Sequence, residues 1–105
     1  MSSAATLHVL ADPCRQAILD LLREGERPVG DLVTHLGRSQ PGVSRHLRVL
    51  REAGLVESRI DAQRRVYRLR LEPLEELDAW LSTYRTLWTA RLDQLEAHLD
   101  EGRAT

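Results

Sequence analysis

The chain has 105 residues, 42% apolar and 30% charged, which fits one globular domain rather than a disordered segment. It has no apolar run of about 18 residues and no secretory signal peptide, which argues against membrane insertion and export. Cys14 is the sole cysteine, so no intrachain disulfide can form, and we expect a cytoplasmic protein without a membrane partner.

The formal charge of −1 is distributed unevenly along the chain. Residues 1–37 carry a net −2, residues 38–70 a net +6 and residues 71–105 a net −5. A basic segment between acidic ends favours local binding of a polyanion such as nucleic acid, whatever the total charge. All 15 basic residues are arginine. Codon usage in a GC-rich genome is the simplest reason, although arginine also suits phosphate and guanine.

Apolar residues at helical spacing predict three helices in the first third of the chain. The first covers residues 3–10. The second begins at Pro13, with Asp12 as its N-cap, and continues to about residue 25. The third covers about residues 29–36 and ends at a glycine.

A fourth helix is expected over residues 40–53, with Ser39 as its N-cap and Pro41 in its first turn. The connection "GRS" joins it to the third helix. A three-residue turn containing glycine between two helices is typical of a helix-turn-helix, here over about residues 29–53.

The segments "LVESRI" and "RVYRLRL" alternate apolar and polar residues, and "DAQR" separates them. This pattern predicts a β-hairpin over about residues 55–71, with its turn near Asp61 to Arg64. A basic hairpin directly after a helix-turn-helix indicates a wing. Helical spacing returns over about residues 73–100, a length of about 42 Å.

The predicted fold is therefore mainly α, a single winged helix-turn-helix domain over residues 1–105 with a long C-terminal helix. A domain of this size cannot cover the wide apolar stripe of that helix, so we expect a homodimer formed through it and the first helix. The alternative is a helix that folds back on its own domain. The expected interface residues are Leu7, Leu10, Leu77, Trp80, Leu81, Tyr84, Trp88, Leu92 and Leu95.

A helical wheel divides the fourth helix into two sides. Val43, Leu47 and Leu50 form the stripe expected to pack on the domain, and Arg45 and Arg48 lie opposite. A recognition helix presents such residues to the major groove, where Gln reads adenine and Arg reads guanine or binds phosphate. The alternative is a solvated polar face. The residues that this pattern and the basic hairpin predict to contact double-stranded DNA are Gln40, Ser44, Arg45, Arg48, Arg59, Gln63, Arg64 and Arg65.

The segments "ADPCRQAILDLL", "RPVGDLVTHLGRSQPGVSRHLRVLREAGLV" and "RIDAQRRVYRL" resemble the ArsR/SmtB family of bacterial winged-helix repressors. The resemblance covers about residues 5–100, and "SQPGVSRHLRVLREAGLV" is its most specific part. It implies a cytoplasmic homodimer that binds an operator and represses transcription, with dimer contacts through the first and last helices. The resemblance also implies DNA contacts at Ser39 and His46. His46 lies on the shoulder of the wheel, which favours packing or a phosphate contact over base reading.

The resemblance also implies metal sites that this chain lacks in whole or in part. The family's third-helix site has Cys-x-Cys in a sequence like "ELCVCDL", but "ERPVGDL" stands here, with Pro28 and Gly30 at the cysteine positions. That site is therefore excluded. A last-helix site pairs Asp-x-His with His-x-x-Glu; His98 and Glu101 match its second half only. His8, His35 and His46 have no partner at ligand spacing, so we expect no metal and no cofactor.

Cys14 lies in the first turn of the second helix, where the helix dipole lowers a thiol pKa. A redox role is one interpretation, but a small half-buried structural residue is favoured. Trp80, Tyr84 and Trp88 could line a ligand pocket, although dimer core is the preferred interpretation.

A second hypothesis for the whole chain is a winged-helix protein–protein interaction module that docks through its long C-terminal helix. No constellation typical of an enzyme is present, and the sequence identifies neither the operator nor an inducer.

Overall fold

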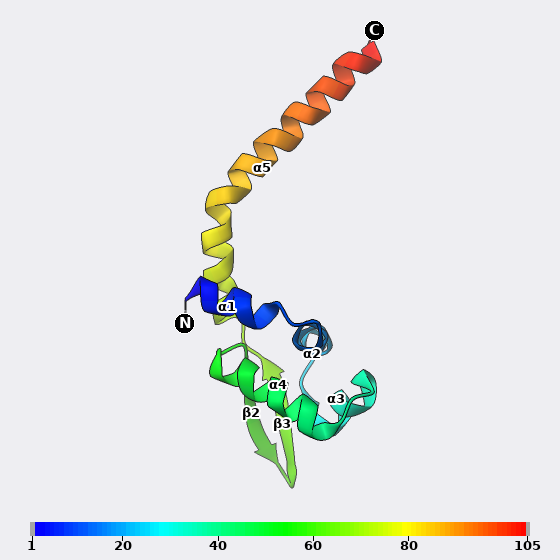
Figure 1. Ribbon diagram of the computed structural model, residues 1–105, viewed down its shortest axis with the longest axis vertical. Coiled ribbons are helices and arrows are strands. Elements are labelled where there is room, and N and C mark those ends of the chain that lie inside the picture. The colour runs from blue at the N-terminus through cyan, green and yellow to red at the C-terminus, as the bar shows by residue number, and fades with distance from the viewer. Residues whose placement is uncertain (1, 105) are drawn as a thin grey trace.

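In the computed structural model, a small body of helices and strands carries one long helix that projects away from it (Figure 1). The structure describes residues 2–104, and side chains for residues 2–102. Its dimensions are 68 × 28 × 20 Å. The elements, in chain order, are α1 (Ser3–Leu10), α2 (Pro13–Arg23), β1 (Arg27–Pro28), α3 (Val29–Leu36), α4 (Gln40–Glu52), β2 (Val56–Asp61), β3 (Arg64–Leu69) and α5 (Glu72–Ala104).

Helices α1, α2 and α4 begin after residues whose side chains accept hydrogen bonds from free N–H groups of the first turn. Asp12 Oδ1 accepts hydrogen bonds from the N–H groups of Cys14 (2.8 Å) and Arg15 (3.1 Å) at the start of α2. Ser39 Oγ accepts one from the Gly42 N–H (3.3 Å) at the start of α4. Both predicted N-caps are confirmed. Gly37, with φ of 62°, ends α3 in the left-handed conformation that permits the tight turn into α4.

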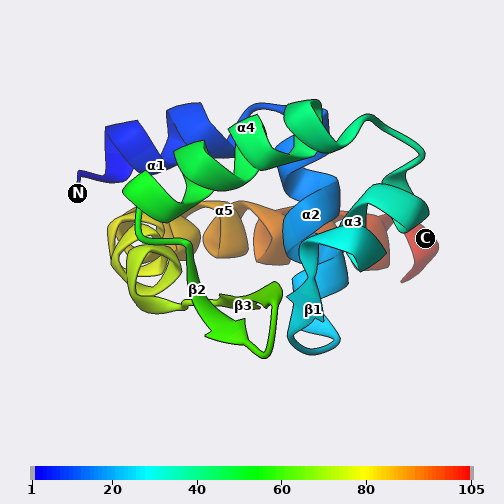
Figure 2. The same cartoon turned by 90° about the horizontal axis from the view of Figure 1, so that it is seen from below.

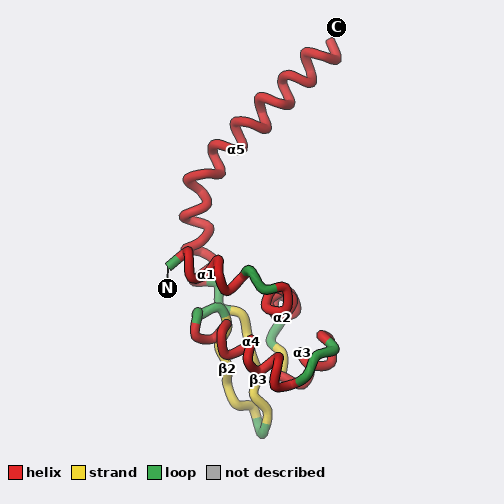
Figure 3. Tube along the Cα trace, viewed as in Figure 1, coloured by secondary structure: helices red, strands yellow, loops and turns green. Residues whose placement is uncertain are grey.

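The sheet has three strands in the order β1-β3-β2, one more than the predicted hairpin. β2 and β3 pair antiparallel, and Asp61 faces Arg64 next to the turn, as predicted. The additional strand β1 is two residues long and pairs with β3, with Pro28 opposite Val66. Proline is tolerated there because β1 is an edge strand that needs few hydrogen-bond donors. Figure 3 shows the hairpin at the end of the body remote from the C-terminus.

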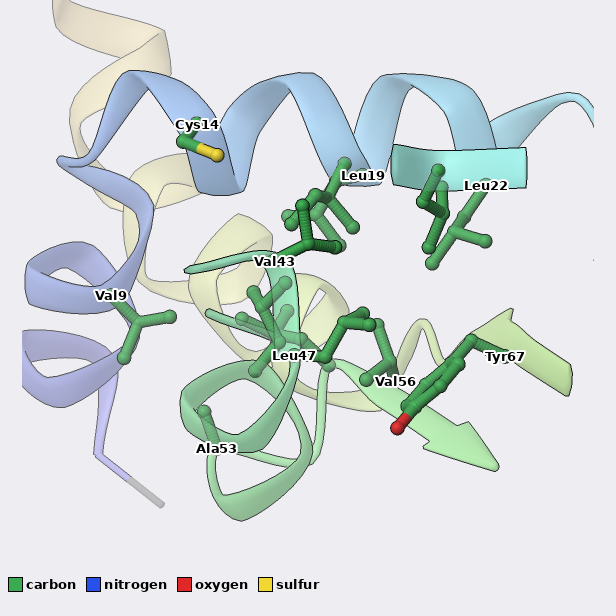
Figure 4. Close-up of a cluster of buried hydrophobic side chains, with 13 residues drawn as sticks. Val9, Cys14, Leu19, Leu22, Val43, Leu47, Ala53, Val56 and Tyr67 are labelled. Atoms are coloured by element: carbon green, nitrogen blue, oxygen red, sulfur yellow. The ribbon is translucent and has the colours of Figure 1, made fainter. Parts of the chain in front are cut away.

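The core lies between α2, α4 and the sheet, and it fixes the orientation of α4. Val43, Leu47 and Leu50 are fully buried, which confirms the predicted stripe. Figure 4 shows Val43 and Leu47 between Leu19 of α2 and the strand residues. Because these three residues bind one side of α4 to the body, the opposite side must face solvent.

The long helix α5 leaves the body instead of folding back on it. It has 33 residues, which correspond to about 50 Å. Its first turns contact α1, and Leu77 there is only 7% exposed. Further along the same face, Trp88 is 45% and Leu92 60% exposed. The fold-back alternative is therefore wrong for the described residues.

Two residues expected at a dimer interface are instead covered by their own chain. Leu77 is buried in the single chain, close to the start of α5. Leu10, at the end of α1, is half-buried against the core cluster. The periodicity could not separate these two residues from the exposed part of the stripe, because intrachain and interchain burial require the same apolar residues.

Candidate nucleic-acid interface

The first three turns of α4 present an uncompensated basic and polar surface. Gln40, Ser44, Arg45 and Arg48 are all exposed, on the side opposite the buried stripe. Neither Arg45 nor Arg48 forms a side-chain hydrogen bond or ion pair with any described residue. Both guanidinium groups can therefore meet an external anion without first breaking an internal contact.

A hollow of about 360 Å³ lies between α4 and the sheet. It is open to solvent, and none of its lining residues is acidic. Polar and basic side chains from α4 and β3 converge on it, with an apolar edge from the start of α3. The lining residues are Val29, Gln40, Ser44, Arg48, Arg51, Arg65 and Tyr67. Helix α4 and the wing thus share one concave basic surface. Figure 2, seen from below, shows α4 and the β2–β3 hairpin in front, with α5 behind them.

The tip of the wing carries a second exposed cationic group. Gln63 lies in the two-residue turn, and Arg64 follows it at the start of β3. Arg64 has no ion pair among the described residues. Arg65 donates a hydrogen bond to Ser58 Oγ (3.1 Å), which holds its side chain along the hairpin beside the hollow.

Arginines nearer the base of the hairpin are paired with acids of the same chain. Arg59 forms ion pairs with Glu26 and, at 3.7 Å, with Asp61. Arg68 pairs with Glu57 and Arg70 with Glu72, and the Glu72 contacts raise the pKa of Arg70 above its ordinary value. The local charge of the basic segment is therefore concentrated on α4 and the wing tip. Arg59, expected at the DNA, has its charge largely compensated.

Comparison with known proteins identifies this arrangement. Residues 12–58, which span α2 to β2, match a family described as bacterial regulatory protein, arsR family. The transcriptional repressor SdpR of Bacillus subtilis is 32% identical over 75 residues, which are 71% of this chain and 83% of that protein.

The chain belongs to the arsR family of bacterial regulatory proteins.

Other relatives of this ArsR-family protein agree in sequence and structure. The regulator Rv2034 of Mycobacterium tuberculosis is 42% identical over 79% of this chain and 75% of its own. The crystal structure of the repressor BigR from Xylella fastidiosa superposes with a TM-score of 0.63, at 34% identity, over 80% of this chain and 84% of that one. The protein is thus a DNA-binding transcriptional regulator of winged helix-turn-helix fold and not an enzyme.

The ArsR-family chain also brings together three residues that the sequence left apart. Asp12 and Cys14, at the start of α2, meet His46 of α4, and one ligand atom from each lies within 4.8 Å of the other two. His46 is half-buried and faces this contact, in line with the predicted packing role. Spacing along the chain could not reveal the contact, because His46 is distant from the other two in sequence.

Apart from the apolar Val29, two residues that line the basic hollow were absent from the predicted DNA-contacting set. Arg51, in the last turn of α4, lies on the same side of the helical wheel as Gln40 and Ser44. Tyr67 of β3 is buried except for its edge on the hollow. The alternation of β3 could have suggested Tyr67, since it shares a face with Arg65, whereas the closeness of Arg51 to the wing depends on tertiary packing.

The remaining metal predictions concern surface positions. His98 and Glu101 both lie on the exposed part of α5. Arg85 stands thirteen residues before His98, where the resemblance would require the aspartate of Asp-x-His, and it pairs with Asp78. The absence of a last-helix site remains a prediction. No helix in the described part of the chain has the length and hydropathy needed to cross a membrane.

Proposed function

We propose that the protein is a homodimeric repressor that binds a pseudo-palindromic operator, with α4 in the major groove and the wing tip on the flanking backbone. The supporting observation is the exposed polar side of α4 over its first three turns. Arg45 and Arg48 there have no partner among the described residues, while Val43, Leu47 and Leu50 on the other side are fully buried. A helix held rigidly by its core side gives the precision that base reading requires.

The wing and the hollow support the same geometry. Arg48 and Arg65 line one concavity, so a phosphate strand lying in it would contact both elements. Arg64 at the tip is free to reach the neighbouring minor groove. Gln40 and Ser44, on the same wall of the hollow, have the donor and acceptor groups that read base edges.

The exposed stripe on α5 supports the homodimer. Its large apolar residues, each 44–64% exposed in the single chain, are Trp80, Tyr84, Leu87, Trp88, Leu92, Leu95 and Leu99. A contiguous apolar surface of this kind marks an interface. A second copy is the simplest occupant, because two-fold pairing would also place two α4 helices for a palindromic site. The cytoplasm, where such an operator lies, remains the proposed location.

A charge-matched pair of double variants tests the DNA contact. Arg45→Ala/Arg48→Ala should weaken binding to promoter DNA from upstream of the protein's own gene by at least about 30-fold, because two base or phosphate contacts are lost. Arg23→Ala/Arg91→Ala removes the same charge from exposed residues outside the basic segment and should change affinity little. Fluorescence anisotropy at several salt concentrations measures both. Equal losses in the two variants would contradict a specific role for α4.

The same salt titration distinguishes a DNA-binding repressor from a protein–protein interaction module. The log of the parent's association constant should fall with log salt at a slope of about −0.9 per phosphate contact. A parent protein without measurable DNA binding at low salt would support a protein–protein interaction module instead.

A further inference from the structure

A cluster of three chemically different side chains joins the start of α2 to the middle of α4. Asp12 and Cys14 come from α2 and His46 from α4. One carboxylate oxygen, the thiol sulfur and one imidazole nitrogen all lie within 4.8 Å of one another. We propose that these residues bind one borderline-soft divalent cation of the zinc type, in a site that links the scaffold to the DNA-facing helix. The inference does not depend on the proposed operator.

The first argument is that the ligand atoms are not engaged in other hydrogen bonds among the described residues. Neither the Cys14 thiol nor the His46 ring forms a hydrogen bond to another described side chain. Asp12 uses Oδ1 to cap α2, and no hydrogen bond to Oδ2 occurs in the described part of the chain, so that oxygen is free to bind a cation. A cation can therefore bind all three residues without removing the helix cap.

The second argument is burial. Cys14 is only 6% exposed, and Asp12 and His46 are half-buried. An ion here would exchange water for protein ligands on its inner side and keep access from solvent on the other. This arrangement leaves a fourth position for water or an external ligand, as in open tetrahedral sites.

The third argument is charge and ligand type. A thiolate and a carboxylate together balance a divalent cation, and imidazole adds a neutral nitrogen ligand. This set of sulfur, nitrogen and oxygen atoms suits zinc or cobalt better than magnesium or calcium, which prefer oxygen alone.

The three ligand atoms need to move only a short distance toward one another to bind a zinc ion. Ligand atoms around a tetrahedral zinc ion lie about 3.4–3.6 Å apart, given bond lengths of about 2.0–2.3 Å. Atoms now within 4.8 Å would approach by about 1 Å, a change within reach of side-chain rotation. Packing explains a half-buried histidine or a buried cysteine, and helix capping explains Asp12, but neither requires their ligand atoms to lie within 4.8 Å of one another.

Cobalt(II) is the probe that tests the site, because Cys14 is the sole cysteine of the chain. Thiolate ligation gives Co²⁺ a near-ultraviolet charge-transfer absorption, so this band can arise only from Cys14. The full-length protein, kept reduced without added thiol, should develop the band with one Co²⁺ per chain. Zn²⁺ should abolish the band by displacement, and Zn²⁺ alone should raise the melting temperature.

Three variants and one control assign the ligands. Cys14→Ser should lose the band, and His46→Gln and Asp12→Asn should each weaken Co²⁺ binding by at least about tenfold. Asparagine keeps a side-chain oxygen for the α2 cap, so Asp12→Asn should remain folded. His35→Gln removes an exposed imidazole elsewhere and should bind as the parent does. Absence of the band in the parent, or unchanged affinity in both His46→Gln and Asp12→Asn, would overturn the proposal.

Discussion

The carboxylate of Asp12 caps helix α2 and also lies beside His46 of α4. Its Oδ1 accepts hydrogen bonds from the backbone N–H groups of Cys14 and Arg15. One of its oxygens lies within 4.8 Å of a ring nitrogen of His46. The hydrogen bond from the Arg15 N–H, with help from His46, holds the pKa of Asp12 below its usual value of 3.8, against the opposing effect of desolvation. The ionised form is therefore the one that the folded protein stabilises.

This pKa shift makes the stability of the protein depend on pH. A carboxyl group whose pKa is lowered by folding stabilises the protein fully above its unfolded pKa, and that contribution is lost as the pH falls through the folded pKa. Asp12→Asn keeps the cap but not the charge. The parent should melt at a higher temperature than Asp12→Asn at neutral pH, and the difference should shrink as the pH falls below 3.8.

Thermal melts over a pH series, with metal chelated, measure the difference. Asp12→Ala serves as the second variant, because it removes both cap and charge and should melt below Asp12→Asn at every pH. A parent–asparagine difference that stays constant with pH would show that the charge contributes nothing.

At the residue scale, local chemistry made much of the site predictable. The wheel separated Leu47 from Arg48 because helical geometry alone places them on different sides. It could not show that Arg59 pairs with Glu26 or that His46 meets Asp12. Those contacts depend on how distant segments pack, and no spacing along the chain encodes that packing.

At the scale of single elements, the wing turn contains a strained residue. Ala62 has φ of 58°, the one positive value among the described non-glycine residues. The left-handed conformation costs a residue with a Cβ about 1–2 kcal/mol, although glycine adds entropy to the unfolded chain. Ala62→Gly should therefore raise the free energy of unfolding by about 0.5–1 kcal/mol, as measured by urea denaturation.

The adjacent turn residue provides the control. Gln63→Gly adds the same flexibility where no positive φ requires it, so it should lower stability slightly. Equal effects at the two positions would show that Ala62 carries no strain.

Two elements differ from their predicted form for physical reasons. The strand β1 has only two residues, one of them Pro28, and its pairing with β3 is long-range. No alternation can be detected in so short a segment. The helix α5 covers its predicted apolar stripe and continues to Ala104; Asp100 and Gly102 are weak helix formers, but no proline follows Leu99 to block the helix.

For the whole molecule, the exposed stripe of α5 predicts association. The double variant Leu92→Glu/Leu95→Glu would place charges within the proposed interface and should convert the dimer to monomer. Thr86→Glu/Ala97→Glu adds the same charge on the opposite, polar side of α5 and should remain dimeric. Sedimentation velocity measures both, and circular dichroism shows whether the variants stay folded.

Two results would contradict the dimer proposal. A parent that sediments as a monomer at micromolar concentration would exclude a stable homodimer. A dimer that persists in Leu92→Glu/Leu95→Glu would show that its interface lies elsewhere. In either case, the exposed apolar residues of α5 would need a different partner.

The projecting α5 has a consequence for the dose response of regulation. If two copies must pair before both half-sites of an operator are filled, the occupied fraction rises with the square of the number of free chains while dimers are scarce. A doubling of synthesis would then raise occupancy up to fourfold. The uncovered stripe would thus make repression respond steeply to protein synthesis, with no inducer and no cooperativity between separate operators.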